Sequence, residues 1–156
     1  MATKKKKLTV LTAVLVLVGG GAAFAYWTAG GSGTGSASTA ASTTAITAVQ
    51  TSTVSALAPG AAAQTLSGNF TNTNSGPVYV TTVVASIASV TKSGTAVAGC
   101  DATDYTLANA TMTVGAQVQA GSAQGSWTGA TLQFNNKATN QDACKGATVN
   151  LAYTVS

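Results

Sequence analysis

The sequence predicts an all-β protein: one antiparallel β-sandwich that follows an N-terminal leader and a flexible linker. Residues 45–156 contain short runs in which apolar and polar residues alternate, and a period of two is that of half-buried strands. Turn-forming residues separate these runs about every 8–12 residues. The same region has no stretch with the period of an amphipathic helix, and its length suits a single sandwich domain.

About seven to nine strands are predicted, most of them rich in the β-branched residues Val and Thr. They cover residues 46–55, 64–71 and 78–91, a short hairpin strand after Lys92-Ser93-Gly94, residues 105–114, residues 124–134 as one long or two short strands, and residues 148–155. Such a count fits either an immunoglobulin-like or a jelly-roll-like sandwich.

Two of these runs have informative patterns. In residues 78–91 apolar side chains fall on both faces, so we expect this strand to be central or bent between two sheets. Residues 148–155 show the cleanest alternation, with four apolar side chains on one face. Between the strands, residues 99–104 are interpreted as a helical turn with Asp101 as its N-cap, and residues 135–146 as a loop or short helix.

Residues 1–25 have the order of a secretory signal peptide. Consecutive lysines and a nearly unbroken apolar run lead to Ala23-Phe24-Ala25, in which Ala23 and Ala25 form the cleavage signal. We therefore expect export and cleavage after Ala25. The alternative is an uncleaved anchor that extends to Trp27, although the strongly apolar run is shorter than the ~20 residues that span a bilayer.

Residues 26–44 form the predicted linker. After Tyr26 and Trp27 they are almost entirely Gly, Ser, Thr and Ala, so they cannot bury enough apolar surface to offset the entropy of the chain. A flexible spacer is favoured over a glycosylated stalk because the stretch contains no proline.

The net charge of +4 comes entirely from the four lysines of the leader. The remaining charged residues balance one another: Lys92, Lys137, Lys145, Asp101, Asp104 and Asp142. Three scattered lysines cannot neutralise a row of phosphates, so nucleic acid is excluded as a partner. We expect contact with a membrane only through an uncleaved leader, and the expected partner is a second copy of the chain or a component of the cell envelope.

Cys100 and Cys144 are the only cysteines, so an exported chain allows one pairing. The chain has no Cys-x-x-Cys motif and no histidine, which argues against disulfide exchange and against zinc. The predicted bridge closes a loop of about 45 residues, which is worth ~4 kcal/mol in the chain-entropy model.

A bridge between the two cysteines would gather the three carboxylates, Asp101, Asp104 and Asp142, because each lies within four residues of a cysteine. They are the weak candidates for a calcium site, since Ca²⁺ takes several oxygen ligands from Asp side chains and loop carbonyls. The spacing of known calcium loops is absent, so the favoured interpretation is that these residues cap turns and pair with Lys145. No other cofactor is expected.

The chain has neither histidine nor glutamate, which removes the usual general acid–base groups and activators of a nucleophile. We therefore expect no enzymatic activity and assign no catalytic residue. Four aromatic residues offer a sugar-binding face as an alternative, although aromatic residues on sheets are more often part of a core: Tyr79, Tyr105, Trp127 and Tyr153.

The leader ends in Ala-Tyr-Trp-Thr at residues 25–28, and in this it resembles exported proteins of the TasA/camelysin class. That resemblance implies extracellular fibres in which residues 28–44, followed by the strand at 46–55, form a donor arm for the next subunit. It also implies metalloprotease activity, which the lack of histidine opposes. Three segments are similar to small exported proteins of actinobacteria: SGNFTNTNSGPVYVTTVVASI, GCDATDYTL and FNNKATNQDACKGATVNLAYTVS.

The expected function is that of a secreted or cell-surface structural or interaction module, without enzymatic activity, that self-associates by adding a strand at a sheet edge. The alternative is an extracellular module that binds carbohydrate or calcium.

Overall fold

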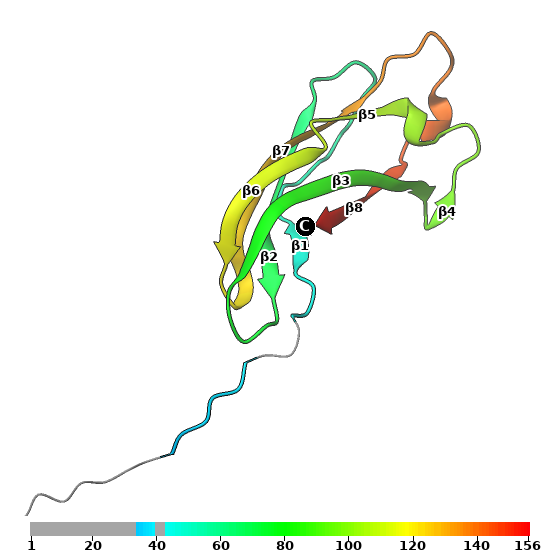
Figure 1. Ribbon diagram of the computed structural model, residues 1–156. Coiled ribbons are helices and arrows are strands. Elements are labelled where there is room, and N and C mark those ends of the chain that lie inside the picture. Colours follow the sequence, from blue (N-terminus) through cyan, green and yellow to red (C-terminus); the bar gives the residue numbers. More distant parts are fainter. Residues whose placement is uncertain (1–33, 40–42) are drawn as a thin grey trace, which may run out of the picture. The chain divides into compact units, whose positions relative to one another are not determined.

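The computed structural model describes residues 34–39 and 43–156 (Figure 1). The predicted signal peptide and its cleavage residues Ala23 and Ala25 lie outside the described residues. Residues 34–39, which belong to the predicted linker, are exposed and have no regular secondary structure. Within the described part of the chain, no helix has the length and apolar character needed to cross a membrane.

The described residues form strands joined by turns and two short 3₁₀ helices. These elements are β1 (Thr47–Gln50), β2 (Gln64–Asn72), β3 (Val78–Lys92), β4 (Thr95–Ala96), η1 (Ala102–Asp104), β5 (Tyr105–Ala108), β6 (Thr111–Val118), β7 (Gly121–Phe134), η2 (Asp142–Cys144) and β8 (Thr148–Val155). The predicted hairpin strand after Gly94 and the predicted helical turn before Tyr105 are both present.

The strands pair antiparallel in two sheets, which confirms the predicted all-β sandwich. One sheet has the order β1-β2-β7-β5. In the other sheet β3 pairs with β4, β6 and β8. Figure 1 shows β3 curving along one layer with β8 beside it, while β2 and β7 lie in the other layer.

β3 is the central strand of its sheet, as its two apolar faces predicted. β6 pairs with residues 78–84 of β3, and β8 pairs with residues 83–91. The register with β6 shifts between Val80 and Thr82, and the alternation of β3 changes at the same place, so that Val80 and Val83 are both buried. A bulge of this kind re-aims side chains along a strand, which is why a strict period of two placed these two valines on opposite faces.

β7 is one long strand that contains three irregularities. Its register against β2 shifts three times, and a residue with left-handed backbone lies at each shift: Gly129, Gly125 and Ala123. Glycine adopts this conformation without steric cost because it has no Cβ. The bulges bend the strand and increase its twist, which lets a strand of this length follow the curved sheet.

The core lies between the two sheets and includes side chains from both. Its most completely buried large residues are Phe70, Leu66, Leu132, Val80 and Val83. Trp127 is also buried, at 2% exposed; its Nε1–H donates to the carbonyl oxygen of Asn69 at 3.0 Å, and its ring packs on Tyr153 with the centroids 4.6 Å apart.

The first predicted strand was too long. β1 ends at Gln50 and not at Ser55, because the N–H groups of Thr51 and Ser52 both donate to the carbonyl oxygen of Ser67 and the chain then leaves the sheet. The alternation of Thr and Val continues beyond this point in the sequence. Side-chain pattern alone therefore could not locate the end of the strand.

The predicted strand at residues 105–114 is in fact two strands in different sheets. β5 pairs with β7, whereas β6 pairs with β3. Between them Asn109 has a left-handed backbone with φ of 51°, a conformation that Asn tolerates better than most residues. The turn at Asn109 carries the chain from one sheet to the other.

Candidate functional site

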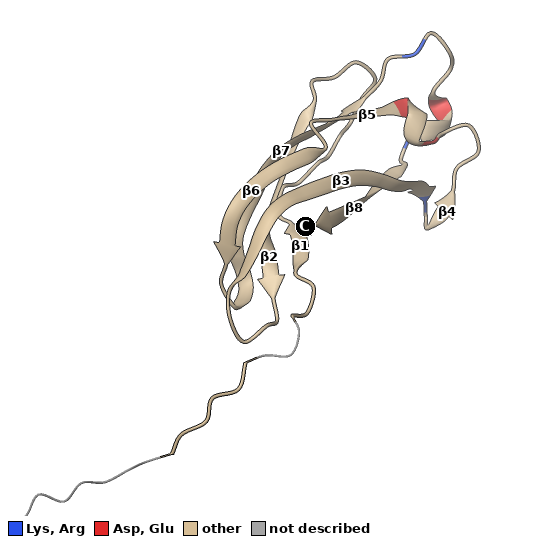
Figure 2. Cartoon of the chain, viewed as in Figure 1, with Lys and Arg blue, Asp and Glu red and all other residues tan. Residues whose placement is uncertain are grey.

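The charged side chains of residues 43–156 gather at one end of the sandwich, around η1, η2 and β4 (Figure 2). They are Lys92, Asp101, Asp104, Lys137, Asp142 and Lys145. Away from this charged end, the strands present uncharged side chains. The charged end also holds the predicted disulfide and the three candidate calcium ligands.

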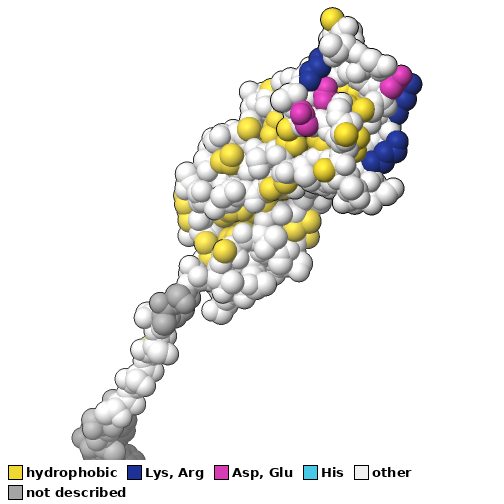
Figure 3. Space-filling view, turned by 90° about the vertical axis from the view of Figure 1, so that its right-hand side faces the viewer, with side chains coloured by type: hydrophobic (Ala, Val, Ile, Leu, Met, Phe, Trp, Pro, Cys, Tyr) yellow, Lys and Arg dark blue, Asp and Glu magenta, His cyan; other side chains and the backbone are white. Residues whose placement is uncertain are grey.

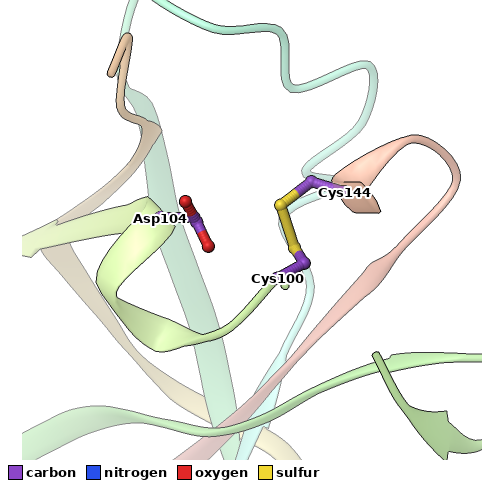
Figure 4. Close-up of side chains that lie close together, drawn as sticks. All are labelled: Cys100, Asp104 and Cys144. Carbon is purple, nitrogen blue, oxygen red and sulfur yellow. A yellow bond between two sulfur atoms is a disulfide. The ribbon is translucent and has the colours of Figure 1, made fainter. Parts of the chain in front are cut away.

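Cys100 and Cys144 form the predicted disulfide, with their Cα atoms 5.2 Å apart (Figure 4). Both cysteines are buried. The bridge links the segment before η1 to the last residue of η2, although the two cysteines are 44 positions apart in the sequence. It therefore holds two loops of the charged end together.

Asp101 and Asp104 cap η1 reciprocally. Asp101 Oδ1 accepts a hydrogen bond from the backbone N–H of Thr103 at 2.8 Å, and Asp104 Oδ2 accepts one from the backbone N–H of Asp101 at 2.9 Å. The hydrogen bonds from the side chain and backbone of Thr103 lower the pKa of Asp101. The predicted N-cap role of Asp101 is confirmed, and Asp104 completes a capping box.

Asp104 is the buried carboxylate of the charged end, at 6% exposed. Its Oδ1 lies 2.8 Å from Lys137 Nζ and accepts a hydrogen bond from Gln141 Nε2 at 3.2 Å. The hydrogen bond from Lys137 and then that from the Asp101 backbone hold the pKa of Asp104 below its usual range. No local pattern in the sequence predicted either side-chain partner, and both come from the loop before η2.

Asp142 pairs with Lys145, as predicted. Asp142 Oδ1 and Lys145 Nζ are 2.6 Å apart, and the two side chains are 66% and 78% exposed. The hydrogen bond from Lys145 lowers the pKa of Asp142. An ion pair this exposed is screened by water and salt, so it contributes little to stability.

The three acids lie at the same end of the domain, but they do not converge on one point. Among the described residues, the potential metal ligands that lie close together are Asp104, Cys100 and Cys144, whose ligand atoms are within 4.8 Å of one another (Figure 4). The two sulfurs are bonded to each other, so neither is a thiolate available to a metal. The capping and pairing contacts match the favoured interpretation, and calcium binding by Asp101, Asp104 and Asp142 stays a prediction.

Acid is expected to destabilise the domain through Asp104. Its pKa is lower in the folded chain than in the unfolded chain, so its contribution is complete above the unfolded value, near 3.9, and is lost as the pH falls through the folded value. The free energy of unfolding can be measured with urea at about pH 7 and at about pH 3. Its decrease between the two pH values should be smaller for Asp104→Asn than for the native protein.

The exposed carboxylate provides the control for this measurement. Asp142→Asn removes the same charge from a side chain that is 66% exposed, so its loss of stability on acidification should equal that of the native protein. If Asp104→Asn also loses as much as the native protein, Asp104 is not the source of the pH dependence.

A cavity of about 870 Å³ opens beside the charged end. Its walls come from the loop after β1, the ends of β5 and β7, the loop around η2 and the start of β8. The main apolar side chains of this cavity are Val54, Leu57, Leu132, Phe134, Val149 and Leu151. Figure 3 shows hydrophobic side chains at the surface among the charged ones at this end of the domain. No pattern in the sequence predicted this cavity.

The early end of β1 creates the cavity. The Tyr153 hydroxyl donates to Gln50 Oε1 at 2.7 Å, so β1 still reaches β8 at its last residue. Beyond Gln50 the loop is held away from β8, because the Gln64 side chain exchanges two hydrogen bonds with the Ser55 backbone and the Gly60 N–H donates to the Phe134 carbonyl. The loop carries several alanines, whose small side chains leave the space open.

The aromatic residues do not form a shared surface. Tyr105 and Trp127 are buried, and Tyr153 is half-buried against Trp127. Burial raises the pKa of Tyr105 and of Tyr153. Tyr79 alone among these four is largely exposed, at 60%. This arrangement matches the interpretation of the aromatic residues as core rather than as a platform for sugar rings.

The candidate features of this chain are therefore the disulfide-linked charged end and the cavity beside it. The resemblances found in the sequence, to the TasA/camelysin class and to exported actinobacterial proteins, stay predictions. No protein-family model, curated protein or solved structure matches the chain.

Proposed function

We propose that this protein is a structural or interaction module that works outside the cell, without enzymatic activity, and that it self-associates by adding strands at its sheet edges. Export is supported by the signal-peptide order of residues 1–25 and by the disulfide, because disulfides persist in oxidising compartments. The absence of histidine and glutamate from the chain supports a role without catalysis.

The proposal of strand addition rests on the residue types of the edge strands. β1 and β5 lie at the edges of one sheet, and β6 and β8 at the edges of the other. None of these four strands contains a charged residue or a proline. Soluble proteins normally protect such edges with charges, prolines or bulges, because a free edge is a template for another strand.

β8 and β6 are the longest of these edges, at eight residues each. β8 pairs with β3 on one side, while its other side pairs with no strand of the described residues. The start of β8 borders the cavity, where the loop after β1 has moved away. The domain carries equal numbers of Lys and Asp, so net charge does not keep two copies apart. The partner we propose is therefore a second copy of this chain.

A lysine on β8 is expected to weaken self-association. Ala152 is exposed on this edge strand. When the β8 strands of two copies pair, the introduced lysines face each other, and this repulsion weakens the pairing by up to about 1 kcal/mol. Light scattering across a concentration series should show that Ala152→Lys needs about fivefold more protein to assemble than the native chain.

The matched control places the same charge on the central strand. Thr81 is exposed on β3, so Thr81→Lys changes the net charge equally without charging an edge. It should assemble at the native concentration. A native protein that stays monomeric at every concentration would exclude self-association, and equal effects of the two lysines would exclude the β8 edge.

A further inference from the structure

We propose that the cavity beside β8 binds an anionic amphiphile: a single unbranched hydrocarbon chain that ends in a carboxylate or a phosphate. The chain would lie between the two sheets, and the acid group would lie at the lysines of the rim. Binding needs no second copy, but the cavity borders the start of β8, the edge proposed above for strand addition.

The size and walls of the cavity suit a hydrocarbon chain. Its volume of about 870 Å³ is at the upper end of the range of about 300–1,000 Å³ that small-molecule sites occupy. Leu132 and Phe134 come from one sheet, Val149 and Leu151 from the other, and Leu57 from the loop that closes the side. An apolar chain bound here would leave water, together with the exposed parts of the half-buried Leu57, Val149 and Leu151.

The cavity is held open by contacts that do not depend on a ligand. Gln64 fixes the loop wall through its two hydrogen bonds to Ser55. Tyr105 stacks on Phe134 with the ring centroids 4.9 Å apart, and the disulfide anchors Cys144, which also lines the cavity. A site that is formed before binding needs no ordering of its loops when the ligand arrives.

The rim offers a lysine that can pair with an anion. Lys137 and Lys145 line the cavity together with Asp142. Lys137 is held by the buried Asp104 at 2.8 Å, so Lys145 is the lysine whose partner is easily exchanged. Lys92 Nζ donates to the carbonyl oxygen of Lys145 at 2.9 Å, so a third ammonium group lies close by. Lys145 is 78% exposed, and its ion pair with Asp142 is weak for that reason, so the head group of a ligand can replace Asp142 as the partner of its ammonium group.

The same geometry disfavours a sugar. The polar side chains of the cavity, such as Gln50 and Gln141, are only half-buried, whereas Leu132 and Phe134 are buried apolar residues. A hydroxylated ring placed against them would lose its hydrogen bonds to water without replacing them.

Calorimetric titration with a series of linear carboxylates tests the proposal. Octanoate, nonanoate and decanoate should bind one per chain, with affinity rising about fourfold for each added CH₂ group until the cavity is full. Decyl phosphate and decanol have the same chain as decanoate but a phosphate or a neutral hydroxyl as head group. Decanoate and decyl phosphate should both bind more tightly than decanol, and the tighter of these two anions identifies the preferred head group.

Four variants locate the binding. Ala58 is exposed on the loop and lines the cavity, so Ala58→Trp should fill the space and weaken decanoate on the order of tenfold or more. Ala88→Trp, on the exposed side of β3, should bind as the native protein does. Lys145→Gln should weaken decanoate by up to about fivefold and leave decanol unchanged, whereas Lys145→Arg should restore the affinity.

The proposal is overturned if the native protein binds none of these ligands, or if affinity does not depend on chain length. It is also overturned if Ala58→Trp binds decanoate as tightly as Ala88→Trp. Should Ala58→Trp not fold, the comparison of Lys145→Gln with Lys145→Arg decides, because Lys145 is exposed and its replacement does not disturb the core.

Discussion

Reduction of the Cys100–Cys144 disulfide is expected to lower the free energy of unfolding by about 4 kcal/mol. The cysteines are 44 positions apart, and a cross-link across about that length removes this much conformational freedom from the unfolded chain. The whole stability of a small domain is only about 5–15 kcal/mol. Urea unfolding with and without a dithiol, followed by the fluorescence of the buried Trp127, measures the loss.

A double variant separates the cross-link from the packing of its sulfurs. Both cysteines are buried, so Cys100→Ala with Cys144→Ala removes the bridge and also leaves small voids. The reduced native protein lacks the bridge but keeps the sulfur atoms. Its loss of stability should therefore be slightly smaller than that of the double variant. Equal unfolding midpoints for the oxidised and reduced native protein would contradict the prediction.

Local patterns in the sequence predicted most of the sheet correctly. β8 was expected at residues 148–155 and is found there, and β2 and β3 each extend one residue beyond the predicted end. In β2 and β8 one face is packed against a single neighbouring layer, so alternation of apolar and polar residues reports the environment directly. Asp101 was also correct as a cap, because capping depends on residues two or three positions away.

The errors arise where contacts between distant residues decide the outcome. β1 ends early because residues 51 and 52 bind the backbone of Ser67, and β5 and β6 separate because they pair with strands of different sheets. The candidate site follows the same rule. The disulfide was predictable because only two cysteines exist, whereas the Asp104–Lys137 pair joins residues 33 positions apart. The cavity depends on a loop leaving its sheet, for which the sequence has no local signal.

Replacement of Trp127 by alanine is expected to destabilise the domain by about 3–5 kcal/mol, the cost typical of removing a buried aromatic side chain. Trp127 is 2% exposed, and its ring lies against Tyr153 and fills the space above Gly68, where any Cβ would overlap it. The variant would also leave the Asn69 carbonyl without the indole N–H that donates to it. Urea unfolding followed by circular dichroism measures the change.

Two further variants show where this cost comes from: one loses the indole N–H but keeps an aromatic ring, and the other removes an exposed aromatic ring as a control. Trp127→Phe keeps most of the apolar area but loses the N–H, so it should cost about 1–3 kcal/mol. Tyr79→Ala removes an aromatic ring that is 60% exposed, and it should change stability by no more than about 0.5 kcal/mol. If Trp127→Ala cost no more than Tyr79→Ala, the packing between the two sheets would not depend on this side chain. The core would then rest on the aliphatic residues around Leu66 and Val83, which are fully buried on the facing sheets.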